Sequence, residues 1–191
     1  MLHRMPTGLD DLSELIKSRR TSLLIDPVKD VPLALVESLC ELALWAPNHK
    51  RTWPWRFAAF TGDGRSRLGE AFAEDLVETQ DAEESRVSKT RTKYLRAPVV
   101  VLVGSAAHQN PKVQRENEYT VAAGLQNMLL GATAVGLASF WSSPPLDLAK
   151  RASELSKFDT GTRLLAVVYL GWPAAEVGTP ERPSVQLHVV Q

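Results

Sequence analysis

Val99-Val100-Val101-Leu102-Val103 is a run of five apolar residues that no polar residue interrupts. A strand with one face in water alternates apolar and polar residues, whereas an uninterrupted run is typical of a strand buried on both faces. A second, mostly aliphatic run spans Arg163–Leu170. Because apolar residues at helical spacing lie before and between these runs, the sequence predicts one α–β domain.

The remaining elements follow from periodicity, caps and turn residues. We expect helices that begin near Asp10 and near Pro32, a strand over 56–61, one long polar helix over 65–91, a loop over 108–112, a helix over 117–135, a strand over 137–141 and a helix over 146–155. No repeat or linker marks a boundary, so residues 1–191 are expected to form a single domain. The tail from Pro173 is apolar at its end (Val185, Leu187, Val189 and Val190), which predicts that it covers another surface.

Composition excludes several classes of function. Twenty-two Lys and Arg balance 22 Asp and Glu over 191 residues, so neither nucleic acid nor an anionic membrane surface is an expected partner. One Cys and four His predict neither an internal disulfide nor a metal site. Residues 1–10 lack the apolar segment of a secretory signal, so a cytoplasmic location is expected.

The common motifs of catalysis and phosphate binding are missing. Gly62-Asp63-Gly64 lacks the third glycine of a dinucleotide fingerprint, and no glycine-rich stretch ends in the Lys-Ser/Thr pair of a P-loop. Cys40 lies on the apolar face of the second helix and is interpreted as a buried structural thiol. The basic cluster around Tyr94 could contact RNA, but a solvated helix end is the favoured interpretation.

Three stretches stand out chemically. Residues 17–22 (Lys-Ser-Arg-Arg-Thr-Ser) combine guanidinium groups and hydroxyls, which suit phosphate oxygens, although an ordinary basic helix end has the same composition. Residues 45–57 hold three of the five Trp beside His and Lys, as in the wall of a pocket for a flat ligand with polar edges. Residues 139–144 (Ser-Phe-Trp-Ser-Ser-Pro) form a turn that offers backbone N–H groups beside hydroxyls.

Taken in order, these stretches resemble the FMN-dependent nitroreductases of the short, single-domain bacterial type. The resemblance rests on an opening Arg-Arg-Ser-like motif, an Ala-Pro-x-His-Lys segment followed by Pro-Trp-Arg-Phe, an Arg-Ala-Pro before a strand, a Trp-x-Ser turn and a Tyr-Leu-Gly-x-Pro strand exit. They are matched by residues 19–21, 46–50, 54–57, 96–98, 141–143 and 169–173. The resemblance covers about residues 12–182.

The resemblance implies an α+β fold, a mixed sheet flanked by helices, in an intertwined homodimer with FMN at the subunit interface. It implies that Arg19, Arg20 and Thr21 hold the phosphate and ribityl chain of FMN, and that Arg182 in the tail adds a second phosphate contact. It places Trp45 and His49 near the flavin, with Trp141, Ser142 and Ser143 along its ring. The tail, about 173–191, would pack on the partner. Gly124, Gly131 and Ala132 give the 117–135 helix a small-residue face, which together with the tail predicts an obligate dimer.

The implied activity is electron transfer from NAD(P)H through FMN to a nitroaromatic or quinone-like acceptor, with ping-pong kinetics. Because the flavin carries the chemistry, no catalytic residue is nominated. Trp45 and Ser142 stand where the family frequently has Arg, so a flavin-binding or small-ligand sensor with little turnover is an alternative, and an FMN-free interaction protein is a third. No motif selects the acceptor or chooses NADH over NADPH.

Overall fold

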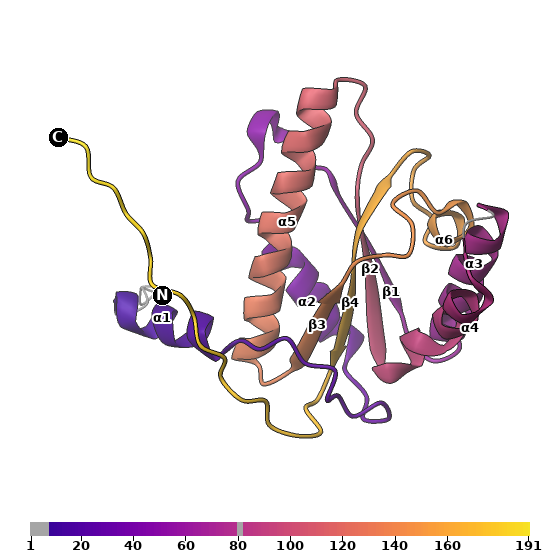
Figure 1. The fold of residues 1–191 in the computed structure, drawn as a ribbon, viewed down its shortest axis with the longest axis horizontal. Helices are drawn as coiled ribbons and strands as arrows, with labels where there is room; N and C mark the ends of the chain where they lie inside the picture. Colours follow the sequence, from indigo (N-terminus) through magenta and orange to yellow (C-terminus); the bar gives the residue numbers. More distant parts are fainter. Residues whose placement is uncertain (1–7, 80–81) are drawn as a thin grey trace.

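The computed structural model describes residues 8–79 and 82–191, and its centre is a four-stranded sheet in the order β1-β2-β4-β3 (Figure 1). The strands are β1 (Trp55–Phe60), β2 (Val99–Ser105), β3 (Ala138–Ser142) and β4 (Arg163–Gly171). All three strand pairs are antiparallel. An isolated parallel bridge joins Thr21 to Ser139, on the outer side of β3.

Helices cover both faces of this sheet (Figure 1). They are α1 (Leu9–Ser18), α2 (Leu33–Ala43), α3 (Gly64–Glu78), α4 (Glu84–Thr92), α5 (Pro111–Ala134) and α6 (Lys150–Leu155), with short 3₁₀ segments η1 (His49–Arg51) and η2 (Lys93–Arg96). Val99, Val101 and Val103 of β2 pack with α2 and α5, whereas Val100 and Leu102 pack with α3. The uninterrupted apolar run of β2 is thus buried on both faces. The predicted fold class, α+β with a mixed sheet flanked by helices, is confirmed, and the bridge between Thr21 and Ser139 is the parallel contribution to a sheet whose four strands pair antiparallel.

The small residues of α5 serve packing within the chain. A Cβ added to Gly124 would lie 2.4 Å from the carbonyl oxygen of Ala43, and one added to Gly131 would lie 2.4 Å from Cδ1 of Leu42. Both neighbours belong to α2 or its end, so these glycines let α2 and α5 approach closely. This face of α5 is therefore not the dimer surface that the sequence suggested.

Three predicted helices differ from the observed ones, one of them only at its start, since the helix expected over 146–155 is α6 and begins at Lys150. The expected single helix over 65–91 is wrong: α3 ends at Glu78 and α4 begins at Glu84, with residues 80–81 outside the described chain. The helix expected over 117–135 begins earlier, at Pro111, where the side chain of Asn110 accepts hydrogen bonds from the backbone N–H groups of Lys112 and Val113. Asn followed by Pro is a helix-start signal, and it lay inside the stretch interpreted as a loop.

The tail leaves the sheet after β4 and extends away from it past α1 (Figure 1). Its apolar side chains are exposed, up to 94% for Val190. Within the described residues, no helix is long and apolar enough to cross a membrane, and no group of three or more His, Cys, Asp or Glu side chains could hold a metal ion.

Candidate functional site

The first and third unusual stretches meet at the outer edge of β3. The backbone N–H of Ser22 donates to the carbonyl of Ser139 at 3.0 Å, beside the parallel bridge between Thr21 and Ser139. This pairing aligns the end of α1 with the strand that leads to Trp141 and Ser142. We call residues 19–22 together with 138–143 the strand half-site.

The outer edge of β3 also leaves backbone groups open. β3 is an edge strand, and the carbonyl of Ser139 points outward because it accepts from Ser22. N–H and C=O groups alternate in direction along a strand, so those of Trp141 point outward as well. No described residue bonds to them. Beyond them the hydroxyl of Ser142 donates to the carbonyl of Ser143 at 3.2 Å.

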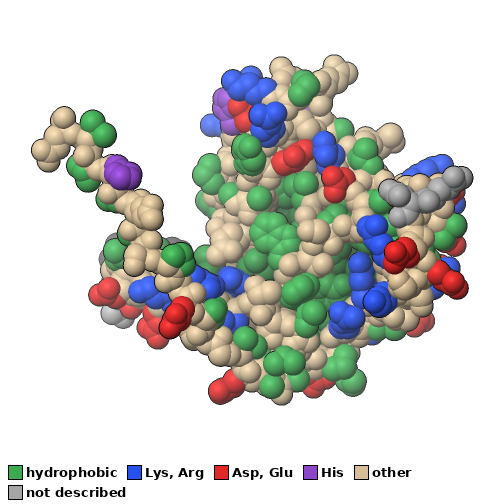
Figure 2. Space-filling model, in the orientation of Figure 1, with side chains coloured by type: hydrophobic (Ala, Val, Ile, Leu, Met, Phe, Trp, Pro, Cys, Tyr) green, Lys and Arg blue, Asp and Glu red, His purple; other side chains and the backbone are tan. Residues whose placement is uncertain are grey.

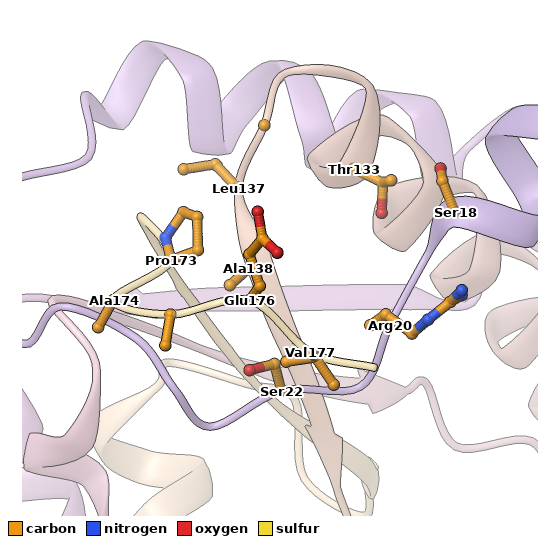
Figure 3. Close-up of a pocket in the computed structure, with 12 residues that line it drawn as sticks. Ser18, Arg20, Ser22, Thr133, Leu137, Ala138, Pro173, Ala174, Glu176 and Val177 are labelled. Carbon is orange, nitrogen blue, oxygen red and sulfur yellow. The ribbon is translucent and has the colours of Figure 1, made fainter. Parts of the chain in front are cut away.

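Arg20 lies at one end of a cavity of about 500 Å³, on the side of Ser18 and Thr133 (Figure 3). Its Nη1 donates to the carbonyl of Arg19 at 2.9 Å, and its Nη2 donates to the hydroxyl of Thr179 in the tail. Its Nε is buried and has no partner among the described residues. A guanidinium with one open buried donor and one donor on a lone hydroxyl suits an anion such as phosphate.

The tail lines the same cavity. Pro173 and Ala174 lie at the end away from Arg20, and Glu176 points into the space between (Figure 3). Glu176 was not anticipated from the sequence, and its carboxylate opposes the binding of an anion close to it. Arg182 is not in the cavity: its Nη1 donates to the carbonyl of Glu181.

Arg19 and Thr21 complete this end of the strand half-site. Nη1 of Arg19 contacts the hydroxyl of Thr21 at 3.4 Å, and the backbone N–H of Arg19 closes α1 on the carbonyl of Leu15. Two guanidinium groups and two hydroxyls therefore lie within four residues, Arg19 to Ser22, and the buried hydroxyl of Ser22 already accepts from the backbone N–H of Leu24.

The second unusual stretch forms a separate group over the start of α5. Trp45 is 84% exposed, and the exposed His49 places Nδ1 2.7 Å from Oε2 of Glu116. The hydrogen bond to His49 holds the pKa of Glu116 below its usual value. The hydroxyl of Thr120 anchors this loop by donating to the carbonyl of Pro47 at 3.1 Å. We call residues 45–53 the loop half-site.

The backbone of the loop half-site is strained. Lys50, Arg51 and Trp53 have φ values of 60°, 51° and 51°, a region that residues other than glycine rarely adopt. Asn48 fixes the turn, since its side chain accepts from the backbone N–H of Trp53 at 2.9 Å and donates to Thr52, which in turn donates to the buried Asn117. Clustered strain of this kind is a feature of ligand-binding loops.

The two half-sites do not meet within one chain. Glu116, under His49, and Thr133, beside Arg20, are seventeen residues apart on α5. At 1.5 Å per residue this is about 25 Å along the helix. Figure 1 shows η1 and α1 at opposite ends of α5. The structure therefore brings Arg19, Arg20 and Thr21 to β3 and leaves Trp45 and His49 apart from them.

Comparison with known proteins shows the family to which the chain belongs. The model of the nitroreductase family matches residues 16–172. The chain belongs to the nitroreductase family. The matched range contains both half-sites of this nitroreductase-family chain and ends before the tail, so Arg182 lies outside it.

Relatives of this family member match along most of their length. The Escherichia coli (strain K12) protein named "Putative NAD(P)H nitroreductase YdjA" is 26% identical over 90% of this chain and 92% of its own length. A solved nitroreductase-like protein from Bacillus cereus is 25% identical, covers 96% of this chain and 95% of its own, and superposes with a TM-score of 0.75. A nitroreductase from Bacteroides fragilis, solved with bound FMN, is 21% identical with a TM-score of 0.75, covering 95% of this chain and 99% of its own.

Two other interpretations from the sequence are decided by burial in this nitroreductase-family chain. Cys40 is half-buried against the α2–α5 core, and burial, with a smaller effect of Glu37, raises the pKa of its thiol to about 11, as expected for an unreactive structural thiol. Tyr94 is completely buried, stacked between Phe72 and Tyr169, so it offers no surface on which an RNA base could stack.

Proposed function

We propose that the chain is an FMN-dependent oxidoreductase that takes electrons from NAD(P)H and passes them to nitroaromatic or quinone-like acceptors in a ping-pong mechanism. The observation that carries this proposal is the pairing of residues 19–22 with β3. It aligns a cluster of guanidinium and hydroxyl groups with a strand edge whose outward N–H at Trp141 has no described partner.

The described residues fit FMN. Arg20 has a buried Nε without a partner among the described residues, and its Nη2 is bonded to a single hydroxyl that a phosphate oxygen would replace. Arg19 and Thr21 would add further donors at the phosphate and ribityl chain. Arg182 stays in the proposed set because it follows Thr179 by three residues, a reach of about 10 Å of extended chain.

At the ring end, the backbone N–H of Trp141 would donate to the edge of the flavin, with Ser142 and Ser143 beside it. FMN supplies hydride acceptance from the nicotinamide and electron delivery to the second substrate. The protein's own contribution is to bind the phosphate, orient the ring on β3 and place hydrogen-bond donors along its polar edge. No side chain is assigned as a nucleophile or general base.

We further propose that the functional unit is a homodimer in which each flavin site combines the strand half-site of one chain with the loop half-site of its partner. The half-sites lie about 25 Å apart along α5 of one chain, too far to share a ligand. Trp45 and Trp53 of the loop half-site are exposed, and so are the apolar side chains of Leu42 and Leu44 before it, of Tyr119 on α5 and of the tail. A large exposed apolar surface is typical of an interface.

In this proposal residues 1–191 form one FMN-binding domain whose tail, about 173–191, packs on the partner subunit. The proposed location is the cytoplasm, where the nicotinamide donor is supplied.

Absorbance spectroscopy tests the proposed function. The purified chain should show flavin bands, anaerobic NADPH or NADH should bleach them, and a nitroaromatic acceptor should restore them. A chain that binds no added FMN would refute the proposal. Flavin bands that neither donor bleaches would favour the sensor alternative, which the replacement of two frequent arginines by Trp45 and Ser142 motivates.

A further inference from the structure

A second cavity lies between α4 and the turn that follows β3. Its volume is about 410 Å³, and it is lined by Arg86, Lys89 and Lys93 on one side and by Ser143, Pro144 and Pro145 on the other. This is within the range of small-molecule sites. Figure 2 shows Lys and Arg side chains gathered on this side of the molecule, separated by apolar surface from a second basic group near α1.

The cavity is joined to the strand half-site through the backbone. Ser143 directly follows the last residue of β3, so the wall of the cavity begins where the proposed ring position ends. Nη2 of Arg86 donates to the carbonyl of Pro145 at 3.0 Å and ties α4 to this turn. Lys89 and Lys93 lie one and two helical turns beyond Arg86, so their side chains share its face.

No acidic side chain of the described residues neutralises the positive charge in the cavity. None of these three basic side chains forms an ion pair with an acid of the described chain, whereas Arg91 of the same helix pairs with Glu70 at 3.0 Å. Glu83 reaches only Ser85 at the rim, with 3.5 Å between the two side-chain oxygens. Lys89 and Lys93 are therefore available to an external anion, whereas Arg86 is held by the carbonyl of Pro145.

Lys93 shows the electrostatic cost of this arrangement. It is half-buried, with Nζ 5.2 Å from the centre of the Tyr94 ring. Burial, reinforced by the like charges of Arg86 and Arg96, holds the pKa of Lys93 below its usual value. A bound anion would relieve this repulsion, because an opposite charge within a few ångströms favours the protonated amine.

We propose that this cavity binds an anionic group, a carboxylate, sulfonate or phosphate, of a substrate whose reactive part lies against Trp141–Ser143. The inference rests on the proposed function and adds a substrate class to it. Lys89 and Lys93 contact the anion, and Arg86 is a positioning residue that holds the turn. The anionic group belongs either to the electron acceptor or to the electron donor, where it would be the 2′-phosphate of NADPH. The experiment below separates these two sources.

The test compares Lys89→Gln, Lys93→Gln and the matched control Arg91→Gln, which removes one charge from the same helix outside the cavity. Binding is measured first, by calorimetry with benzoate and with uncharged benzyl alcohol, without any electron donor. Each lysine variant should weaken benzoate binding about tenfold, the effect of one lost charge-assisted contact. Arg91→Gln should leave the dissociation constant within about twofold, as expected for an exposed pair.

Steady-state kinetics then identifies the source of the anion. If the acceptor carries it, the lysine variants lose about tenfold in kcat/KM for 4-nitrobenzoate and keep kcat/KM for nitrobenzene. If the donor carries it, they lose in kcat/KM for NADPH and keep it for NADH.

Equal effects of the lysine variants on charged and uncharged probes, or no effect on either, would overturn the inference. Lys89 is exposed, so Lys89→Gln keeps the test valid if the half-buried Lys93 position does not tolerate change. Lysine-dependent benzoate binding in a protein without turnover would support the anion site and refute the proposed function. Turnover of nitroaromatic acceptors whose kcat/KM changes neither with the charge of the substrate nor in the lysine variants would support the proposed function and refute the anion site.

Discussion

Replacement of Arg20 by Ala should weaken FMN binding much more than riboflavin binding, because only FMN carries the phosphate. Two of its donors are not committed to a backbone carbonyl: Nε, which is buried without a partner among the described residues, and Nη2, which donates to a single tail hydroxyl. One charge-assisted contact stabilises binding by roughly 1.5–3 kcal/mol, which is about ten- to a hundredfold in the dissociation constant. Two donors in a fixed fork place the expected loss at the upper end.

The measurement is quenching of FMN and of riboflavin fluorescence at fixed salt. Arg20 also donates to the carbonyl of Arg19, and losing this bond would affect both flavins alike, so the ratio of the two losses isolates the phosphate. Arg67→Ala, on the exposed side of α3, removes the same charge away from the cavity and should change neither affinity. Equal weakening of FMN and riboflavin by Arg20→Ala would mean that Arg20 supports the fold or the ring, and its phosphate assignment would be wrong.

Four further outcomes are expected. Asp75 is 4% exposed and accepts from the backbone N–H groups that begin α6, so Asp75→Asn should lower the free energy of unfolding in urea by about 1–3 kcal/mol. Glu78→Gln, which removes an exposed partner of Arg151, should lower it less. The hydrogen bond to His49 lowers the pKa of Glu116, so His49→Ala should lower the free energy of unfolding most above pH 4.5, the usual pKa of a Glu. The difference in stability between wild type and His49→Ala should shrink as the pH falls below this value. A difference that grows in acid would contradict the prediction. Light scattering at micromolar concentration should give a dimeric mass, and a monomeric mass would refute the proposed dimer. Double-reciprocal plots for donor and acceptor should be parallel, and intersecting lines would refute the proposed ping-pong mechanism.

The sequence predicted the parts of the fold that depend on local patterns. The runs of β2 and β4 identified two strands buried on both faces, because uninterrupted apolar sequence has few other stable placements. Asn110 followed by Pro111 is an equally local signal for the start of α5, but the predicted helix began at residue 117 instead. The break between α3 and α4 was missed because acidic and basic residues continue through it in an order that also suits one helix.

The candidate site was only partly accessible from the sequence. The hydroxyls and guanidinium groups of Arg19–Ser22 stand together in the chain, so their chemistry was visible, but their pairing with β3 is a contact over more than a hundred residues. Glu176 in the cavity and Glu116 under His49 depend on tertiary packing, which no local pattern encodes. The same holds for Gly124 and Gly131, whose small size suggested a subunit contact and serves the α2–α5 contact instead.

The placement of the two half-sites at opposite ends of α5 has a genetic consequence. If each flavin site draws one half from each chain, two variants that lose activity at limiting FMN because different halves are damaged should complement one another when mixed. A subunit with Arg20→Ala and a subunit with a disrupted 45–53 loop would form a hybrid dimer in which one site carries both lesions and the other carries none. Random reassociation makes about half of all dimers hybrid, so about a quarter of the sites would regain full activity. Two variants damaged in the same half would regain nothing in any mixture.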